Sequence, residues 1–225
     1  LVCNPSFSDR MFGLRLPCRK LSYVQGVLLS HVFDVFFDKY VFVSDFVRRF
    51  AERHYGIAGP VIPAFIDTDT FHSEGAPSAH ERQPVCAVMQ RKHQPPVLER
   101  LRQVYAALYG ETLPVEMVPV APQAVLAERF RRSRVFLGLD VMEGFGLPVL
   151  EAMACGSAVV GWDSGGCGEY ARPDENALLA RYGDFETLAR LVRRALADDA
   201  AAASLGSAAA ATAAGFTHDR FERSW

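Results

Sequence analysis

The sequence has few of the patterns that define metal or disulfide sites. It contains five cysteines, an odd number, scattered without a Cys-x-x-Cys pair, and its six histidines show no spacing typical of metal ligands. This cysteine usage favours a reducing compartment over a disulfide framework or a zinc site. We therefore expect a cytoplasmic protein, with the inner face of the membrane as the second option, and no bound metal.

Excess charge and long apolar runs are also scarce. The 24 basic and 26 acidic residues give a net charge of −2, which argues against nucleic-acid binding because such proteins usually carry a basic patch. Charged residues interrupt the longest apolar stretches within about 15 residues, so no membrane span is predicted, and no signal peptide is visible. Half of the 225 residues are apolar, which is enough for one large or two small cores.

From residue 85 onward, strand-like and helix-like segments alternate. This rhythm is typical of an α/β fold with a doubly wound parallel sheet. Five segments are strand-like: 85–89, 115–120, 135–139, 158–161 and 176–180. Three longer segments have helical spacing of apolar residues: 97–108, 123–132 and 185–196.

The first 60 residues contain shorter candidates. Residues 21–25 and 40–43 are strand-like, and Ser44 or Asp45 can cap a helix that follows. Polar residues with Pro, Gly and Ser at 73–84 predict a loop.

The most informative stretch covers residues 137–156. An apolar strand ends there, a glycine-spaced turn follows, and Pro148 stands where the first turn of a helix would begin. Gly144 and Gly146 allow a sharp turn and a close approach to a ligand, and a helix N-terminus offers free N–H groups to an anion.

Two acids flank this turn. Glu143 and Glu151 have seven residues between them, and a carboxylate can accept two hydrogen bonds from a vicinal diol such as a ribose. The alternative is that both are solvated surface residues of an ordinary α/β unit.

The segment E-G-F-G-L-P-x-L-E-A-M-A-C-G resembles the E-x7-E signature of the retaining nucleotide-sugar glycosyltransferases with the GT-B fold (glycosyltransferase family 4, group 1). The resemblance continues through the Gly165-Gly166 turn and is most specific over residues 135–180. It implies a GT-B-type fold with a complete C-terminal Rossmann-like domain and a partial N-terminal Rossmann-like lobe.

The resemblance also implies a division of the chain. Residues 1–60 would form the partial, acceptor-side lobe, 61–84 an interdomain linker, 85–215 the nucleotide-sugar-binding domain, and 216–225 a helix that crosses back toward the N-terminal lobe. The linker resembles a V-I-P-x-G-I-D…F segment, with Phe65 in place of the family's glycine. We expect the chain to be a fragment that holds a nucleotide but transfers sugar poorly by itself.

Site residues follow from the same resemblance. Glu143 would hold hydroxyls of the transferred sugar, Glu151 the ribose hydroxyls, and the turn at Val120 the nucleobase. Backbone N–H groups of the glycine turn would contact the sugar or the diphosphate. The implied donor-binding residues of the turn and helix are Gly144, Phe145, Gly146, Leu147 and Glu151.

Cations are needed because the nucleotide diphosphate leaves with negative charge. Family members show G-R followed some residues later by K-G. Here Arg91 and Lys92 are adjacent, and Pro95-Pro96 stand where the lysine of K-G would fall. Arg91 is predicted to be catalytic together with Glu143, and Lys92 to bind the donor. The alternative for Lys92 is a solvated basic turn.

The predicted activity is that of a hexosyltransferase of polysaccharide biosynthesis. It would move a sugar from a UDP-, GDP- or dTDP-linked donor to a glycan or lipid-linked acceptor with retention, without metal or cofactor. Two alternatives stay open: a nucleotide-sugar-binding module without transferase activity, and a GT-B-like nucleotide-sugar epimerase. Peripheral membrane association through the N-terminal lobe is a further expectation. Asp67 and Asp69 are interpreted as turn residues, and Cys155 and Cys167 as packing residues.

Overall fold

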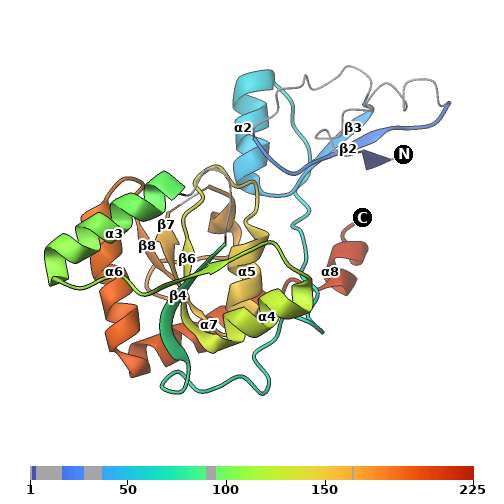
Figure 1. Cartoon of the computed structure of the whole chain (residues 1–225). Helices are drawn as coiled ribbons and strands as arrows, with labels where there is room; N and C mark the ends of the chain where they lie inside the picture. The colour runs from blue at the N-terminus through green and yellow to red at the C-terminus, as the bar shows by residue number, and fades with distance from the viewer. Residues whose placement is uncertain (1, 4–16, 28–36, 90–94, 164) are drawn as a thin grey trace.

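A five-stranded parallel sheet forms the centre of the larger domain (Figure 1). The computed structural model describes residues 2–3, 17–27, 37–89, 95–163 and 165–225. The sheet has the order β5-β4-β6-β7-β8, and every pairing is parallel. Its strands are β4 (Gln83–Met89), β5 (Val115–Val118), β6 (Ser133–Gly138), β7 (Ala158–Trp162) and β8 (Leu178–Ala180). The predicted α/β, Rossmann-like fold class is confirmed.

The central strands are apolar along their length because both faces of the sheet are covered. All five residues of β7 are buried, as expected for a strand between two helical layers. Helices α3 (Pro95–Tyr109) and α6 (Phe185–Ala197) supply one core, α4 (Gln123–Arg132) and α5 (Leu147–Ala154) the other, and α7 (Asp199–Ala213) contributes to both.

Side-chain caps set the starts of several helices, and the sequence predicts the one at Ser44. Ser44 Oγ accepts from Val47 N–H at 3.2 Å at the start of α2 (Asp45–Tyr55). Asp184 caps α6 in the same manner, and Thr217 caps α8 (His218–Arg223).

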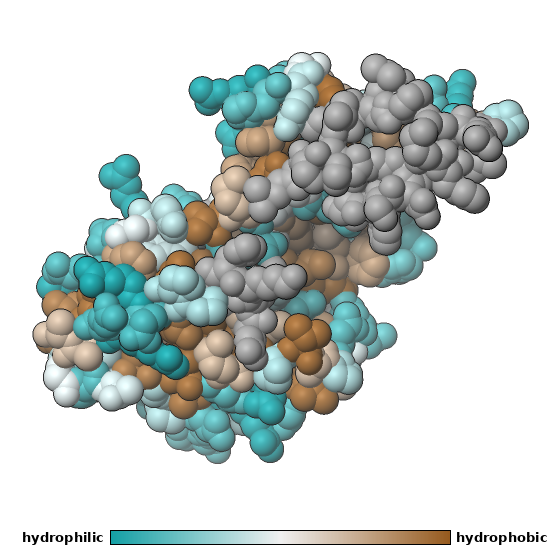
Figure 2. All heavy atoms as spheres, turned by 45° about the horizontal axis from the view of Figure 1, so that its top comes forward, coloured by the Kyte–Doolittle hydropathy of each residue, from teal (hydrophilic) through white to brown (hydrophobic). Residues whose placement is uncertain are grey.

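A smaller parallel sheet precedes the large one. It contains β1 (Val2–Cys3), β2 (Leu21–Val24) and β3 (Lys39–Phe42) in that order. We call this sheet and α2 the N-terminal lobe. Teal residues gather at the top of the lobe in Figure 2. On α2, Arg49, Glu52 and Arg53 are exposed. Ile62 N–H donates to the Phe42 carbonyl at 2.9 Å, so the first residues of the predicted linker extend this sheet.

The end of the chain returns to the N-terminal lobe. Ile66 N–H donates to the Phe216 carbonyl at 3.1 Å. The rings of Phe221 and Trp225 lie 6.0 and 5.5 Å from the ring of Tyr23 on β2. One buried cluster therefore continues from the lobe into the larger domain.

Among the helices that the structure describes, none combines the length and apolar character that crossing a bilayer requires.

Candidate functional site

A cavity lies at the carboxyl edge of the large sheet. From β4 the chain proceeds to β5 on one side, and β6 lies on the other side, so the topology switches between β4 and β6. Ligands of open α/β sheets bind outside the strand ends at such a point. Met89 at the end of β4, Gly138 at the end of β6, and Glu143 and Gly146 from the loop after β6 all line this cavity.

The loop after β6 leads directly into α5. Gly146 is the N-cap residue, has φ +84°, and provides no side-chain cap. Pro148 lies in the first turn, where a missing N–H costs least. Val149 N–H donates to the Gly146 carbonyl at 3.0 Å, which leaves the N–H of Leu147 without an acceptor in the helix. This end of α5 therefore favours an anionic ligand.

Two carbonyl groups of the loop are held by protein donors. Gly166 N–H donates to the Glu143 carbonyl at 3.2 Å, and Ser44 Oγ donates to the Gly144 carbonyl at 2.5 Å. In a trans peptide, a carbonyl and the following N–H point in opposite directions. The N–H groups of Gly144 and Phe145 are therefore directed away from these protein donors.

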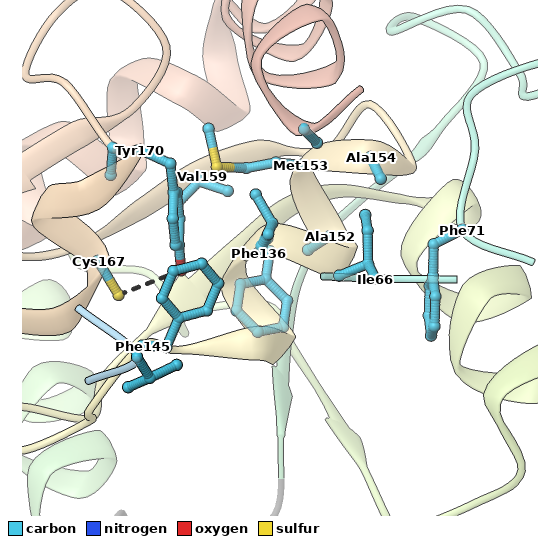
Figure 3. Close-up of a cluster of buried hydrophobic side chains, with 14 of the residues drawn as sticks. Ile66, Phe71, Phe136, Phe145, Ala152, Met153, Ala154, Val159, Cys167 and Tyr170 are labelled. Carbon is cyan, nitrogen blue, oxygen red and sulfur yellow. Dashed lines mark hydrogen bonds between the residues drawn. The ribbon is translucent and has the colours of Figure 1, made fainter. Parts of the chain in front are cut away.

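A third carbonyl group of the loop is held by Tyr170, which follows β7 in the chain, as does Gly166. Tyr170, fully buried, donates through its hydroxyl to the Gly146 carbonyl at 2.7 Å. Figure 3 shows its ring beside Phe145 and a hydrogen bond between its hydroxyl and Cys167 Sγ, 3.5 Å long. By the same peptide geometry, this bond orients the N–H of Leu147, whose residue is 38% exposed at the start of α5.

Both predicted acids lie close to this end of α5. Glu143 and Glu151 are half-buried, and both make interactions within the protein. Burial raises the pKa of the Tyr170 hydroxyl well above its usual value, and neighbouring Cys167, Glu143 and Glu151 act in the same direction. Of the two carboxylates, Glu143 lines the cavity, and Glu151 on α5 is near enough to Tyr170 to act on its pKa.

The remaining predicted site residues are Val120, Phe145, Arg91 and Lys92. Val120 is 87% exposed beyond the end of edge strand β5. The side chain of Phe145 is buried, so only its backbone can meet a ligand. Arg91 and Lys92 lie outside the described residues.

The role expected for the glycines needs correction. A Cβ on Gly144 would lie 2.7 Å from the carbonyl carbon of Gln25, and one on Gly146 would lie 2.6 Å from Cys167 Sγ. Protein atoms, not a ligand, therefore occupy the space in which a side chain would project. These glycines let the loop pack closely against the N-terminal lobe and against the segment after β7.

Sequence reasoning missed the two hydroxyl donors, Ser44 and Tyr170. Ser44 had a detectable signal, since it is a helix cap, but its carbonyl partner lies 100 residues away. Tyr170 had none, because the bond it makes depends on how residues 165–170 fold over α5.

The remaining candidate residues have structural roles or lie on the surface. Asp67 accepts from Asp69 N–H at 3.1 Å and from Thr70 Oγ1 at 2.6 Å, which confirms the turn interpretation. Cys155 and Cys167 are buried in the apolar core, as predicted. In the described part of the chain, one set of possible metal ligands comes together, and it is exposed on α8: His218, Asp219 and Glu222.

Comparison with known proteins gives a consistent picture. Residues 107–212 match the family model of glycosyl transferases group 1. The chain is 32% identical over 122 residues to D-inositol 3-phosphate glycosyltransferase of Streptomyces bingchenggensis (strain BCW-1), a match covering 54% of this chain and 27% of that protein. The protein of the same name from Streptosporangium roseum is 33% identical over 111 residues, which cover 49% of this chain and 26% of that protein. The chain thus spans about a quarter of the length of these curated relatives.

Solved glycosyltransferase structures share the fold. A mutant of S. aureus TarM in complex with fondaparinux, alpha-GlcNAc-glycerol and UDP superimposes with a TM-score of 0.80 at 13% identity, covering 100% of this chain and 54% of that chain. Anabaena Alr3699/HepE in complex with UDP and glucose gives a TM-score of 0.76 at 16% identity, covering 92% and 70%. These likenesses establish the GT-B-type fold.

Proposed function

We propose that this chain, whose residues 107–212 match the family model of glycosyl transferases group 1, carries the donor site of a nucleotide-sugar-dependent transferase. The observation that carries the proposal is that Glu143 and the glycine turn line the cavity at the switch point of the sheet, where α5, the helix that carries Glu151, begins. This arrangement suits a ligand with a diphosphate between two sets of hydroxyl groups.

The leaving diphosphate determines the chemistry. Its charge increases as the bond to the sugar breaks, and fixed N–H dipoles stabilise such charge without reorganising. The amides of Gly144, Phe145 and Leu147 would supply these dipoles, because protein donors already hold the preceding carbonyls. Arg91 and Lys92 would add the positive charge. No metal ion or cofactor enters this proposal.

The two acids would hold the ends of the donor. Glu143 lines the cavity and would accept hydrogen bonds from the transferred sugar. Glu151, further along α5, would accept from the ribose, and Val120 would border the nucleobase. We propose a hexosyl transfer with retention, in which the leaving phosphate helps to deprotonate the acceptor hydroxyl.

UDP is the first nucleotide to test, because the TarM and HepE complexes contain UDP, with GDP and dTDP as alternatives. The acceptor is proposed to be a glycan or lipid-linked saccharide of polysaccharide biosynthesis. A cytoplasmic enzyme with peripheral membrane contact remains part of the proposal.

A second candidate is a nucleotide-sugar-binding module without transferase activity. The adjacency of Arg91 and Lys92, followed by Pro95-Pro96, favours this candidate. Two cations that are separated in the sequence would hold the diphosphate from both sides, and Arg91 and Lys92 do not have that spacing.

Titration calorimetry with UDP, GDP and dTDP tests the donor site. We expect one of these nucleotides to bind, and Glu151→Gln and Arg91→Ala each to weaken binding about tenfold, the usual cost of one charge-assisted hydrogen bond. Glu175→Gln is the matched control, since exposed Glu175 precedes β8 at the opposite edge of the sheet. If none of the nucleotides binds, or if the control weakens binding as much, the donor site is not where we place it.

Product analysis then separates the two candidates. The matching nucleotide sugar is incubated with the chain and a saccharide acceptor, and proton NMR identifies the products and their anomeric configuration. A glycosylated acceptor with retained configuration supports the transferase, an altered donor sugar indicates an epimerase, and an unchanged donor indicates a binding module.

A further inference from the structure

The N-terminal lobe contacts the glycine turn of the larger domain through the start of α2. Asp45 N–H at this helix end donates to the carboxylate of Glu169. The ring of Phe46 lies so close to Gly165 that a side chain there would overlap it. These contacts bring the first turn of α2 against the two loops that follow β6 and β7.

Ser44 makes the central contact of this junction. Its side chain is fully buried, and its oxygen accepts from Val47 N–H at 3.2 Å while its proton is donated to the Gly144 carbonyl at 2.5 Å. One hydroxyl thus caps α2 and also orients the peptide group that precedes Phe145. The two roles use different parts of the hydroxyl, a lone pair and the proton.

The other described donors to this turn come from the larger domain itself. Gly166 holds the Glu143 carbonyl and Tyr170 holds the Gly146 carbonyl. Among the described donors to this turn, Ser44 is the one that belongs to the N-terminal lobe. The orientation of the Phe145 amide therefore depends on the position of that lobe.

We propose that Ser44 is a positioning residue that couples the N-terminal lobe to the donor site. When the lobe is seated against the larger domain, the hydroxyl fixes the Gly144–Phe145 peptide with its N–H toward the diphosphate. When the lobe moves away, the peptide loses its donor and is free to rotate. This inference rests on the proposed function, because it assigns a ligand to the Phe145 amide.

Two substitutions at Ser44 separate positioning from capping. Ser44→Ala removes both the cap and the donor, whereas Ser44→Gly removes the donor but retains a residue tolerated at the N-cap position. Asp184→Ala is the control, because Asp184 caps α6 without contacting the glycine turn. Each variant of the whole chain is measured by UDP calorimetry, by thermal unfolding, and by hydrogen exchange of residues 143–150 without nucleotide.

If Ser44 positions the turn, both of its variants bind UDP about tenfold more weakly. Both also speed hydrogen exchange at residues 143–150, although Ser44→Ala melts at a lower temperature than Ser44→Gly. Asp184→Ala lowers the melting temperature alone. If the loss of UDP affinity is proportional to the decrease in melting temperature across all three variants, Ser44 only caps α2.

The exchange measurement keeps the two proposals distinguishable. Should wild type bind none of UDP, GDP and dTDP, the donor-site proposal fails, and exchange at residues 143–150 still decides whether Ser44 orders the turn. Unchanged exchange in both Ser44 variants overturns the inference, even if UDP binds.

Discussion

The close approach of Gly144 to the N-terminal lobe can be tested by adding one carbon atom. In Gly144→Ala the new Cβ would lie 2.7 Å from the carbonyl carbon of Gln25 and 2.9 Å from Gly26 Cα, both well short of the 3.4 Å at which ordinary contact begins. These are backbone atoms, so no side-chain rotation relieves the overlap. The lobe and the turn must separate, which also breaks the hydrogen bond from Ser44.

The expected cost combines overpacking with one lost buried hydrogen bond. Overpacking typically costs 1–3 kcal/mol, and we expect a total of about 2 kcal/mol because the turn lies at a boundary between lobes that can shift. For a chain of this size, that lowers the melting temperature by about 4–8 °C. Nucleotide affinity should fall as well, by about tenfold, since the Phe145 amide loses its orientation.

Differential scanning fluorimetry and UDP calorimetry measure both effects. Gly168→Ala is the matched control, because a Cβ there meets nothing within 4 Å, and it should leave melting temperature and affinity unchanged. A Gly144→Ala variant with wild-type stability and affinity would show that the lobe does not rest on the turn as the structure has it.

Three further predictions concern the surroundings of the site. Arg82 is 7% exposed and donates to carbonyls at the C-terminal ends of α4 and α5. Because Ser157 Oγ also donates to the Phe130 carbonyl, Arg82→Met removes the side-chain donor of the Cys155 carbonyl alone, and it should cost about 2 kcal/mol and lower the melting temperature by about 4–8 °C in a thermal scan. Tyr170→Phe should cost only about 1 kcal/mol in a urea titration, because the Gly146 carbonyl retains its backbone donors from α5; a loss above 3 kcal/mol would contradict this. Burial raises the pKa of the Cys155 thiol to about 12, so at pH 8 little thiolate forms, and mass spectrometry after maleimide treatment should show labelling at exposed Cys18 but at Cys155 only after unfolding.

Features that depend on neighbours in sequence were predictable. The cap at Ser44, the apolar strands of the large sheet, and the helix that begins after the glycine turn all follow from local spacing and local hydrogen bonding. The positions of Glu143 and Glu151 on either side of that turn follow from the same spacing. Their roles toward a donor remain predictions.

What the tertiary structure alone decided is how the glycine turn is held. Ser44 reaches the turn from 100 residues away and Tyr170 from 24, and Gly144 faces the backbone of Gln25 rather than open space. No periodicity encodes such contacts, because they arise only when the sheet and the N-terminal lobe have packed. The sequence therefore determined that a strand, a glycine turn and a helix with two acids exist here. Packing determined which donors hold the carbonyl groups of that turn and so orient its amides.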